Sequence, residues 1–145
     1  MTTEQALNDY FSGNGLLPEG CTRDDWYAGH MIPYKIGGVT VGAFPILQRE
    51  GPILLHDLHH MLTGCAPNWL GEVELAGWEL ASGGCAWHLF YWFDRVVLGL
   101  IGLITAPKTL LRGLRAGWRH TNLYGMNPKG VLRIDPVALR SYVAL

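Results

Sequence analysis

From Pro52 to the end of the chain, apolar residues recur at the spacing of an α-helix, and this pattern decides the fold class. Leu54, Leu58 and Met61 stand three or four residues apart, which places them on one face of a helix. Prolines and glycines mark the helix ends, because proline suits a first turn and glycine suits the residue after a last turn. The pattern predicts helices at about residues 52–64, 68–81, 87–104 and 107–120, and a last helix that starts after Asp135.

The first fifty residues carry a weaker pattern. Residues 3–11 fit a short helix that is capped by Thr2 or Thr3 and ended by glycines. Residues 31–47 are rich in glycine, proline and β-branched residues, so they fit either a small β-hairpin or an irregular loop. The predicted architecture is all-α, a small helical bundle in one domain over residues 1–145, with a short β-hairpin before residue 50.

The chain carries little charge for its size. Charged residues make up 16% of the sequence, against about 25% in typical globular domains. The formal net charge of −1 gives too weak a field for nucleic-acid binding, so no nucleic acid is expected as a partner. Cys21, Cys65 and Cys85 form no Cys-x-x-Cys pair, which excludes a zinc knuckle and a thioredoxin-type redox site. We expect reduced, buried thiols in a cytoplasmic protein.

The charge deficit is concentrated in residues 80–106. The predicted helix at 87–104 is apolar nearly all round, which is typical of a central helix in a bundle or of a helix that contacts lipid. The central position is the default expectation, with Asp94 and Arg95 meeting water or pairing locally. The apolar run at 96–106 reaches only about 16 Å as a helix, so it is too short to span a membrane.

The following helix carries a basic stripe. Lys108, Arg112, Arg115 and Arg119 are spaced four, three and four residues apart, with no acidic residue among them. A solvated helix face is the ordinary explanation of such a stripe. Beside a large apolar surface, it also suits the anionic head groups of a membrane surface or the diphosphate of a prenyl ligand.

Candidate metal ligands lie on the predicted helix at 52–64. Measured around the helix axis from His56, Asp57 lies at about 100° and His60 at about 40°, so the three share one face. Imidazole nitrogens with a carboxylate suit zinc or another divalent transition metal better than calcium. His59 falls about 60° to the other side, which indicates a surface position or a supporting role behind the ligands.

The next helix supplies a fourth group. Its short connection predicts that the helices at 52–64 and 68–81 pack antiparallel, which brings Glu72 to the ligands. Glu79 stands seven residues after Glu72 and shares its face. Taken alone, Glu79 is better explained as a carboxylate that faces water. A second carboxylate-x-x-histidine unit is missing, so a single metal ion is favoured over a dinuclear site.

The order of these residues resembles a family signature. His56, Asp57 and His60 are followed by Leu62-Thr63-Gly64 and, with eleven residues between it and His60, by Glu72. This motif is similar to that of the ubiquinone (coenzyme Q) biosynthesis protein four family, closely over residues 52–83 and loosely elsewhere. The resemblance implies an all-α fold and a zinc ion bound by His56, Asp57, His60 and Glu72.

The resemblance also implies an activity. It suggests a peripheral membrane protein that removes the C1 carboxylate, coupled to hydroxylation, from a 4-hydroxy-3-methoxy-5-polyprenylbenzoate-like substrate. The four ligands would then act through the metal, and His59 or Glu79 would move protons at the ring carbon. We expect no targeting segment, and therefore a bacterial relative in the cytoplasm, peripheral to the inner membrane.

Two other functions stay open. The first is a non-catalytic protein that binds a prenyl lipid or organises a quinone-biosynthesis complex, with other proteins of that pathway or a second copy of itself as partners. The second is a metal phosphohydrolase, for which the sequence offers no clear separate upstream histidine and downstream aspartate ligands.

Overall fold

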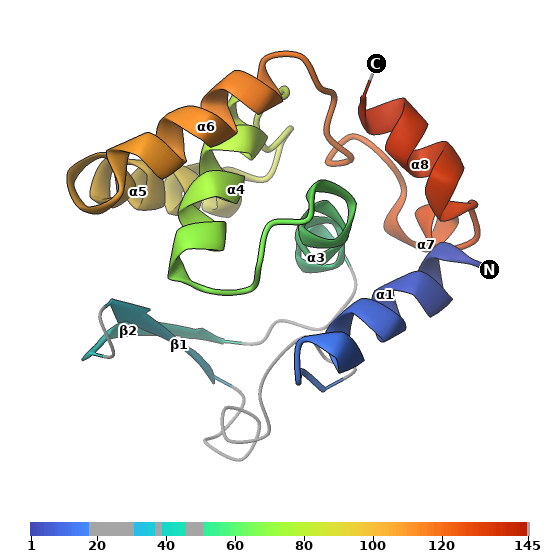
Figure 1. Cartoon of the computed structure of the whole chain (residues 1–145), viewed down its shortest axis with the longest axis horizontal. Helices are drawn as coiled ribbons and strands as arrows, with labels where there is room; N and C mark the ends of the chain where they lie inside the picture. The colour runs from blue at the N-terminus through green and yellow to red at the C-terminus, as the bar shows by residue number, and fades with distance from the viewer. Residues whose placement is uncertain (18–30, 37–38, 46–50, 145) are drawn as a thin grey trace.

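The computed structural model of the chain describes residues 1–17, 31–36, 39–45 and 51–144. Within these residues it contains seven helices and a two-stranded antiparallel sheet (Figure 1). The helices are α1 (Thr3–Gly13), α3 (Pro52–Thr63), α4 (Trp69–Ala81), α5 (Leu89–Thr105), α6 (Pro107–Gly117), α7 (Pro128–Val131) and α8 (Pro136–Val143). The strands are β1 (Met31–Ile36) and β2 (Val39–Pro45). The predicted all-α class and the hairpin before residue 50 are both confirmed.

Local sequence signals set the helix ends. α3 ends before Gly64, whose φ of +78° is the left-handed conformation that glycine adopts without strain. At the start of α4, the Asn68 side chain accepts a hydrogen bond from the Gly71 N–H. Asp135 caps α8 in a similar way. These caps satisfy backbone N–H groups that have no partner inside the helix.

Two features after α5 differ from the prediction. α6 ends at Gly117 and does not reach His120, because the chain tightens there into turns in which the His120 N–H donates to the Gly117 carbonyl oxygen at 3.0 Å. This turn brings the His120 ring against α4, where Nδ1 accepts a hydrogen bond from Trp78 Nε1. The single turn of α7 was not predicted, and Asn127 caps it by accepting from the Gly130 N–H.

α3 lies in the centre of the molecule. In Figure 1 it is seen nearly along its axis, with α4, α5 and α6 on one side and α1, α7 and α8 on the other. Leu55 and Leu58 on α3 are 1% and 0% exposed. The axis of α4 runs in the plane of the same view (Figure 1). α3 and α4 therefore cross, and the expected antiparallel packing of these two helices is wrong. α4 packs along α6 instead.

Glycines allow α6 to lie directly on the backbone of α4. A Cβ atom on Gly113 would lie 1.9 Å from the Glu74 carbonyl oxygen, and one on Gly117 would lie 2.3 Å from that of Trp78. Only glycine fits such a close approach. Sequence periodicity alone does not reveal this contact, because it shows which residues share a face but not which helix that face meets.

α5 occupies an outer position, so the default expectation of a central helix is wrong. Leu98 packs inward at 1% exposure, whereas Leu89 and Ile104 are 81% and 84% exposed. The centre is already filled by α3. Within the described residues, every helix falls short of the length and hydropathy that a membrane-spanning segment needs. Cys65 and Cys85 are free and buried as expected, and Cys21 lies outside the described residues.

Candidate metal centre

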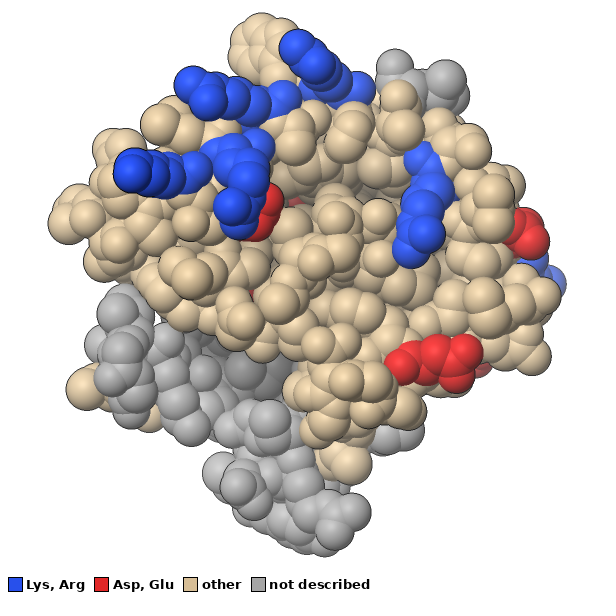
Figure 2. Space-filling view, in the orientation of Figure 1, with Lys and Arg blue, Asp and Glu red and all other residues tan. Residues whose placement is uncertain are grey.

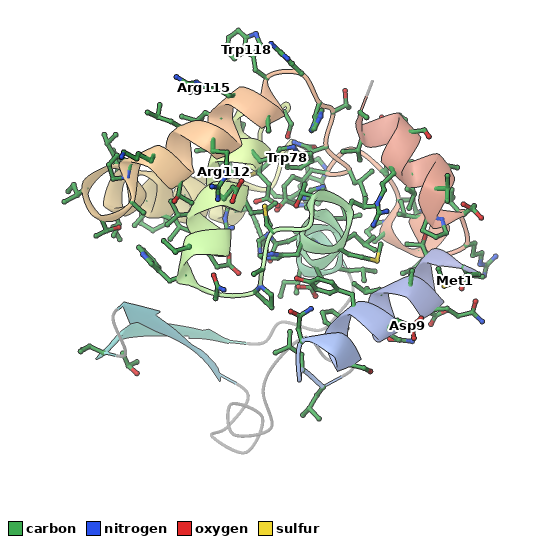
Figure 3. All side chains as sticks on the ribbon, in the orientation of Figure 1. Met1, Asp9, Trp78, Arg112, Arg115 and Trp118 are labelled. Carbon is green, nitrogen blue, oxygen red and sulfur yellow. The ribbon has the colours of Figure 1, made fainter. Side chains whose placement is uncertain are left out.

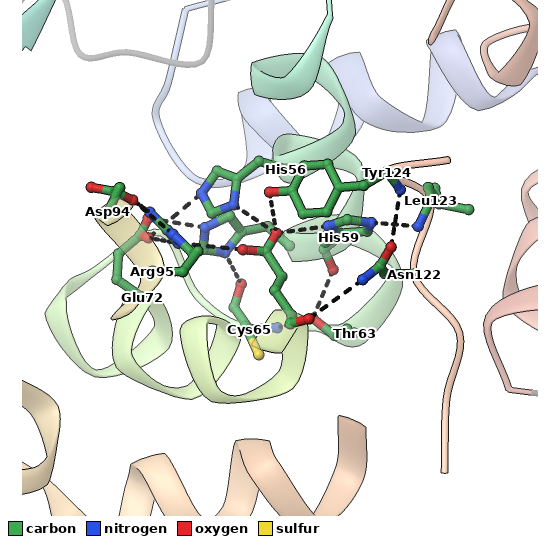
Figure 4. Close-up of polar contacts among 12 residues, drawn as sticks. His56, His59, Thr63, Cys65, Glu72, Asp94, Arg95, Asn122, Leu123 and Tyr124 are labelled. Atoms are coloured by element: carbon green, nitrogen blue, oxygen red, sulfur yellow. Dashed lines mark hydrogen bonds and ion pairs between the residues drawn. The ribbon is translucent and has the colours of Figure 1, made fainter. Parts of the chain in front are cut away.

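Two histidines of α3 and one glutamate of α4 meet where the helices cross (Figure 4). Among the described residues, His56, His60 and Glu72 form the group that could hold a metal ion, with one ligand atom from each lying within 4.8 Å of the others. His60 Nε2 lies 2.9 Å from Glu72 Oε1, and His56 Nε2 lies 3.5 Å from Glu72 Oε2. The His60 side chain is 4% exposed and that of Glu72 is 28% exposed, so the group is buried but opens to one side.

The ring of His60 faces a hydrogen-bond acceptor at each nitrogen. Nδ1 lies 3.0 Å from the Cys65 carbonyl oxygen, and Nε2 faces Glu72. Because a carbonyl oxygen only accepts, Nδ1 carries a proton and donates it. The Tyr10 hydroxyl of α1 donates to the same carbonyl oxygen at 3.1 Å. The ring is therefore fixed with Nε2 directed at Glu72, where Nε2 is either protonated or available to a cation.

The ring of His56 is fixed in the same way by a carboxylate. Its Nδ1 donates to Glu79 Oε1 at 3.0 Å, which leaves Nε2 on the side of Glu72. Histidines that bind a metal through one nitrogen commonly donate the other N–H to a carboxylate or a backbone carbonyl. His56 and His60 show these two arrangements side by side.

Glu79 is the centre of the polar contacts beneath the ligands. Besides His56, its Oε1 accepts hydrogen bonds from His59 Nδ1 at 2.7 Å and from the Tyr124 hydroxyl at 2.8 Å. Glu79 has no exposed surface, so its interpretation as a carboxylate that faces water is wrong. The sequence shows that Glu79 and Glu72 share a helix face. It does not show that this face packs against α3 and is not exposed to solvent.

His59 supports the ligands from behind and is not a surface residue. It is fully buried, and its Nε2 accepts a hydrogen bond from the Leu123 N–H at 2.9 Å. Nε2 therefore has no proton, and the Nδ1 proton is the one donated to Glu79. Burial lowers the pKa of His59, which agrees with a neutral ring. This chain of hydrogen bonds connects His56 to the segment between α6 and α7.

Arg95 of α5 supplies a buried positive charge that sequence reasoning missed. It is 3% exposed, pairs with Asp94, and places Nη1 3.4 Å from Glu72 Oε2 and 3.5 Å from Glu79 Oε2. The local pair with Asp94 was expected, but the position in the site was not. A charged residue inside an otherwise apolar helix is the signal that could have found it, because isolated buried charge is unfavourable.

Electrostatics keep both glutamates ionised. Burial alone raises the pKa of each carboxyl group, but His60 and His56 outweigh it at Glu72, and so do His56, His59 and Arg95 at Glu79. Both pKa values therefore lie well below 4.5. Burial lowers the pKa of His56, but Glu79 and Glu72 raise it to about 10. Without a metal, the two carboxylates therefore hold His56 in its protonated form at neutral pH, and a cation bound at His56 Nε2 would replace that proton.

Asp57 does not join the group formed by the other three predicted ligands. It is half-buried on α3, and its charge contributes to raising the pKa of the Tyr10 and Tyr91 hydroxyl groups, for which burial is the main cause. The metal group found among the described residues contains His56, His60 and Glu72 alone. The role of Asp57 as a ligand stays a prediction.

The predicted basic stripe lies on the outside of α6, away from the metal centre. Its members Lys108, Arg112, Arg115 and Arg119 are all exposed, and Figure 2 shows basic side chains gathered over this helix. Figure 3 places Arg115 on the side of α6 that faces away from α4, and Arg112 between α6 and α4. Arg112 forms an ion pair with Glu74 of α4, so part of its charge is neutralised within the molecule.

Comparison with models of protein families, with curated proteins and with solved structures gave no match. The family resemblance therefore rests on the motif alone.

Proposed function

We propose that His56, His60 and Glu72 bind one divalent transition-metal ion, zinc in the first place. The observation that carries the proposal is the orientation of the two rings. Each has its Nδ1–H tied to an acceptor and its Nε2 directed at the same carboxylate. A cation shared by both Nε2 atoms and Glu72 satisfies all three groups at once.

The distances support this ligand set. Ligand atoms about 2 Å from a tetrahedral zinc ion lie roughly 3.3 Å from one another. The histidine Nε2 atoms lie 2.9 and 3.5 Å from the two oxygens of Glu72, and one ligand atom from each of the three residues lies within 4.8 Å of the others. Two histidines and one glutamate are also the ligand set of several catalytic zinc sites, in which water or substrate takes the fourth position. Asp57 is the candidate for that position if the site is closed and structural.

We further propose that the chain acts on a polyprenylated hydroxybenzoate in quinone biosynthesis, as the motif suggests. A bound ion would stabilise negative charge on the carboxylate or phenolate of such a substrate. In decarboxylation, the bond between ring carbon C1 and the carboxylate carbon breaks and carbon dioxide leaves. The electron pair stays on the ring, and a proton takes the place of the carboxylate. Replacement by a hydroxyl group additionally consumes an oxidant.

The residues around the ligands have separable tasks in this proposal. Glu79 accepts three hydrogen bonds through one oxygen, which supports a role in orienting His56 over the role of proton carrier. Arg95 lies at hydrogen-bond distance from Glu72 and offers positive charge next to the ligands. It would help to place an anionic substrate beside the metal.

The outer surface supports attachment to a membrane. Phe93, Leu100 and Ile104 of α5 are 69%, 60% and 84% exposed, and the basic stripe of α6 follows directly in the sequence. A wide apolar surface beside lysine and arginine is typical of proteins that lie on anionic membranes. We infer a peripheral position at the cytoplasmic side of a bacterial inner membrane.

The same apolar surface favours the second candidate, a non-catalytic protein that binds a prenyl lipid or organises a quinone-biosynthesis complex. In that case the metal would only join α3 to α4. Exposed apolar surfaces of this kind also form protein interfaces, with other enzymes or with a second copy of the chain.

Elemental analysis of the purified, zinc-loaded protein tests the metal site. We expect about one equivalent of zinc per chain and its loss in His60→Ala. His88→Ala is the matched control, because His88 lies outside the group at the start of α5. Absence of stoichiometric metal in the unaltered protein, or equal loss in both variants, would contradict the proposal.

Turnover separates the enzyme from the scaffold. The zinc-loaded protein is incubated with a short-chain prenylated hydroxybenzoate, and carbon dioxide is measured with and without oxygen. An enzyme releases carbon dioxide, and Glu72→Ala abolishes the release while its circular dichroism spectrum is unchanged. A scaffold retains a prenyl lipid, detected by extraction and mass spectrometry, but releases none.

A further inference from the structure

A cleft lies apart from the residues of the candidate metal centre. It has a volume of about 290 Å³ and lies between the end of α3, the paired helices α4 and α6, and α8. Figure 2 shows basic side chains over α6 on one side and over α8 on the other. The volume is at the lower end of the roughly 300–1,000 Å³ range of small-molecule sites, so the cleft suits a small ligand.

Small side chains create the space and large apolar ones line it. Gly113 and Ala116 of α6 form one wall. Gly113 lets α6 lie on the backbone of α4, and a bulkier side chain in place of Ala116 would fill the cleft. Leu62, Trp78 and Val143 also line it, and all three are at most 8% exposed. These are fixed core side chains, so the apolar part of the cleft is preformed.

Two residues that carry N–H donors line the same cleft. Arg140 of α8 lines it, and within the described residues no carboxylate lies at ion-pair distance from this guanidinium group. His120 also lines it, and its Nδ1 accepts the Trp78 Nε1–H at 2.8 Å. The ring therefore carries its proton on Nε2, which is a donor.

Glu74 also lines the cleft and limits the charge that a ligand can carry. Glu74 is paired with Arg112, so this pair adds little net charge. Its carboxylate would still repel a second negative charge on a ligand. The arrangement selects a single negative charge placed at the Arg140 side.

We infer that this cleft binds a small organic monocarboxylate with an apolar body. The carboxylate accepts hydrogen bonds from Arg140 and from His120 Nε2, because a guanidinium group and a neutral imidazole N–H are matching donors. The apolar body packs against Leu62, Trp78 and Val143. His56, His60 and Glu72 do not line this cleft, so its occupation does not require metal.

Trp78 makes the binding observable. Its indole N–H donates to His120 in the cleft wall, and its ring packs against His59 at a centroid distance of 5.1 Å. A ligand that contacts Trp78 or hydrogen-bonds His120 will shift the indole N–H resonance. Trp78→Phe assigns this resonance among those of the six tryptophans.

Nuclear magnetic resonance titration of the full chain with 3-phenylpropionate tests the inference. We expect saturable shifts of the Trp78 indole and of the backbone amides of α8, with a dissociation constant on the order of 0.1–1 mM, as suits so small a ligand. Acetate, which lacks the apolar body, and 3-phenylpropanol, which lacks the charge, should each bind at least about tenfold more weakly.

Two matched arginine variants test whether Arg140 is the group that binds the carboxylate. Arg140→Gln should weaken binding about tenfold or more, whereas Arg133→Gln, which removes an exposed arginine outside the cleft, should leave it unchanged. Ala116→Leu should abolish binding by filling the space. Because Arg140 is exposed, its variant is expected to fold even if Ala116→Leu does not, and thermal melting checks both.

Three results would overturn the inference. The first is equal binding of phenylpropionate and phenylpropanol, the second is unchanged binding to Arg140→Gln, and the third is a set of shifts confined to α5. The last result would place the ligand on the exposed apolar surface and not in the cleft.

Discussion

Glu79 and Arg95 are buried where α3 and α4 cross, whereas Leu89 and Ile104 of α5 have more than four-fifths of their surface exposed. The buried charges are tolerated because each faces opposite charge or several donors, which offsets the loss of water. Exposed apolar side chains gain nothing from water, so a surface of them indicates contact with another molecule. Much of the low charge of the whole sequence therefore lies on the outer face of α5, where apolar side chains are exposed and the charged Arg95 is turned inward.

Glu79→Ala gives the largest effect that this comparison predicts. The change leaves the buried groups of His56, His59 and Arg95 without their acceptor, which lowers the free energy of unfolding by about 3–5 kcal/mol. Chemical denaturation followed by circular dichroism measures it. Glu4→Ala, at an exposed position of α1, is the control and should stay within about 0.5 kcal/mol. Similar effects of the two changes would show that the buried charges do not depend on Glu79.

Two leucines on α5 test whether the exposed apolar face of this helix is uncovered within the protein. Leu98 is 1% exposed and Leu100 is 60% exposed, although both belong to the same helix. Leu98→Ala should lower the free energy of unfolding by about 2–5 kcal/mol, because it leaves a cavity in the core. Leu100→Ala should change it by no more than about 0.5 kcal/mol. A large loss in Leu100→Ala would mean that this face is covered within the protein itself.

The helices could be predicted because their signals are local. Pro52, Gly64 and Asn68 stand at or beside the ends that they predicted, and His56 and His60 share a face because they are one helical turn apart. His56 and His60 of the metal group were also found by this reasoning, because spacing around a single helix is sufficient to show that two side chains can converge. Glu72 lies on α4, and it was expected at the site from the family motif and from an antiparallel packing that the structure does not show.

The supporting contacts could not be predicted, because their partners are distant in the sequence. Glu79 binds Tyr124, 45 residues away, and His59 binds the backbone of Leu123, 64 residues away. Periodicity identifies a face but not its neighbour, which is why Glu79 was assigned to water. For the same reason α5 was expected in the centre, a place that α3 occupies.

Glu79→Gln tests whether the metal ligands depend on the charge of the buried cluster, because it keeps the shape of the cluster and removes the negative charge of Glu79. His56 then loses the anion that fixes its ring, and changes of such supporting groups commonly lower metal affinity 10–100-fold. Competition with a chromophoric chelator measures zinc affinity. Glu74→Gln is the control, since Glu74 pairs with Arg112 on the outside, and it should leave zinc affinity unchanged. Unchanged affinity in Glu79→Gln would show that the ligands do not need this carboxylate.

Arg115→Gln gives the smallest expected effect and tests whether the outer surface meets a membrane. A lysine or arginine near an anionic surface contributes about 1 kcal/mol, so binding to phosphatidylglycerol vesicles should weaken about fivefold, less so at high salt. Arg112→Gln should have a smaller effect, because Arg112 is already paired with Glu74. Cosedimentation with vesicles measures both. If neither change weakens binding, or if the unaltered protein does not bind, the exposed face of α5 contacts a protein partner and not a bilayer.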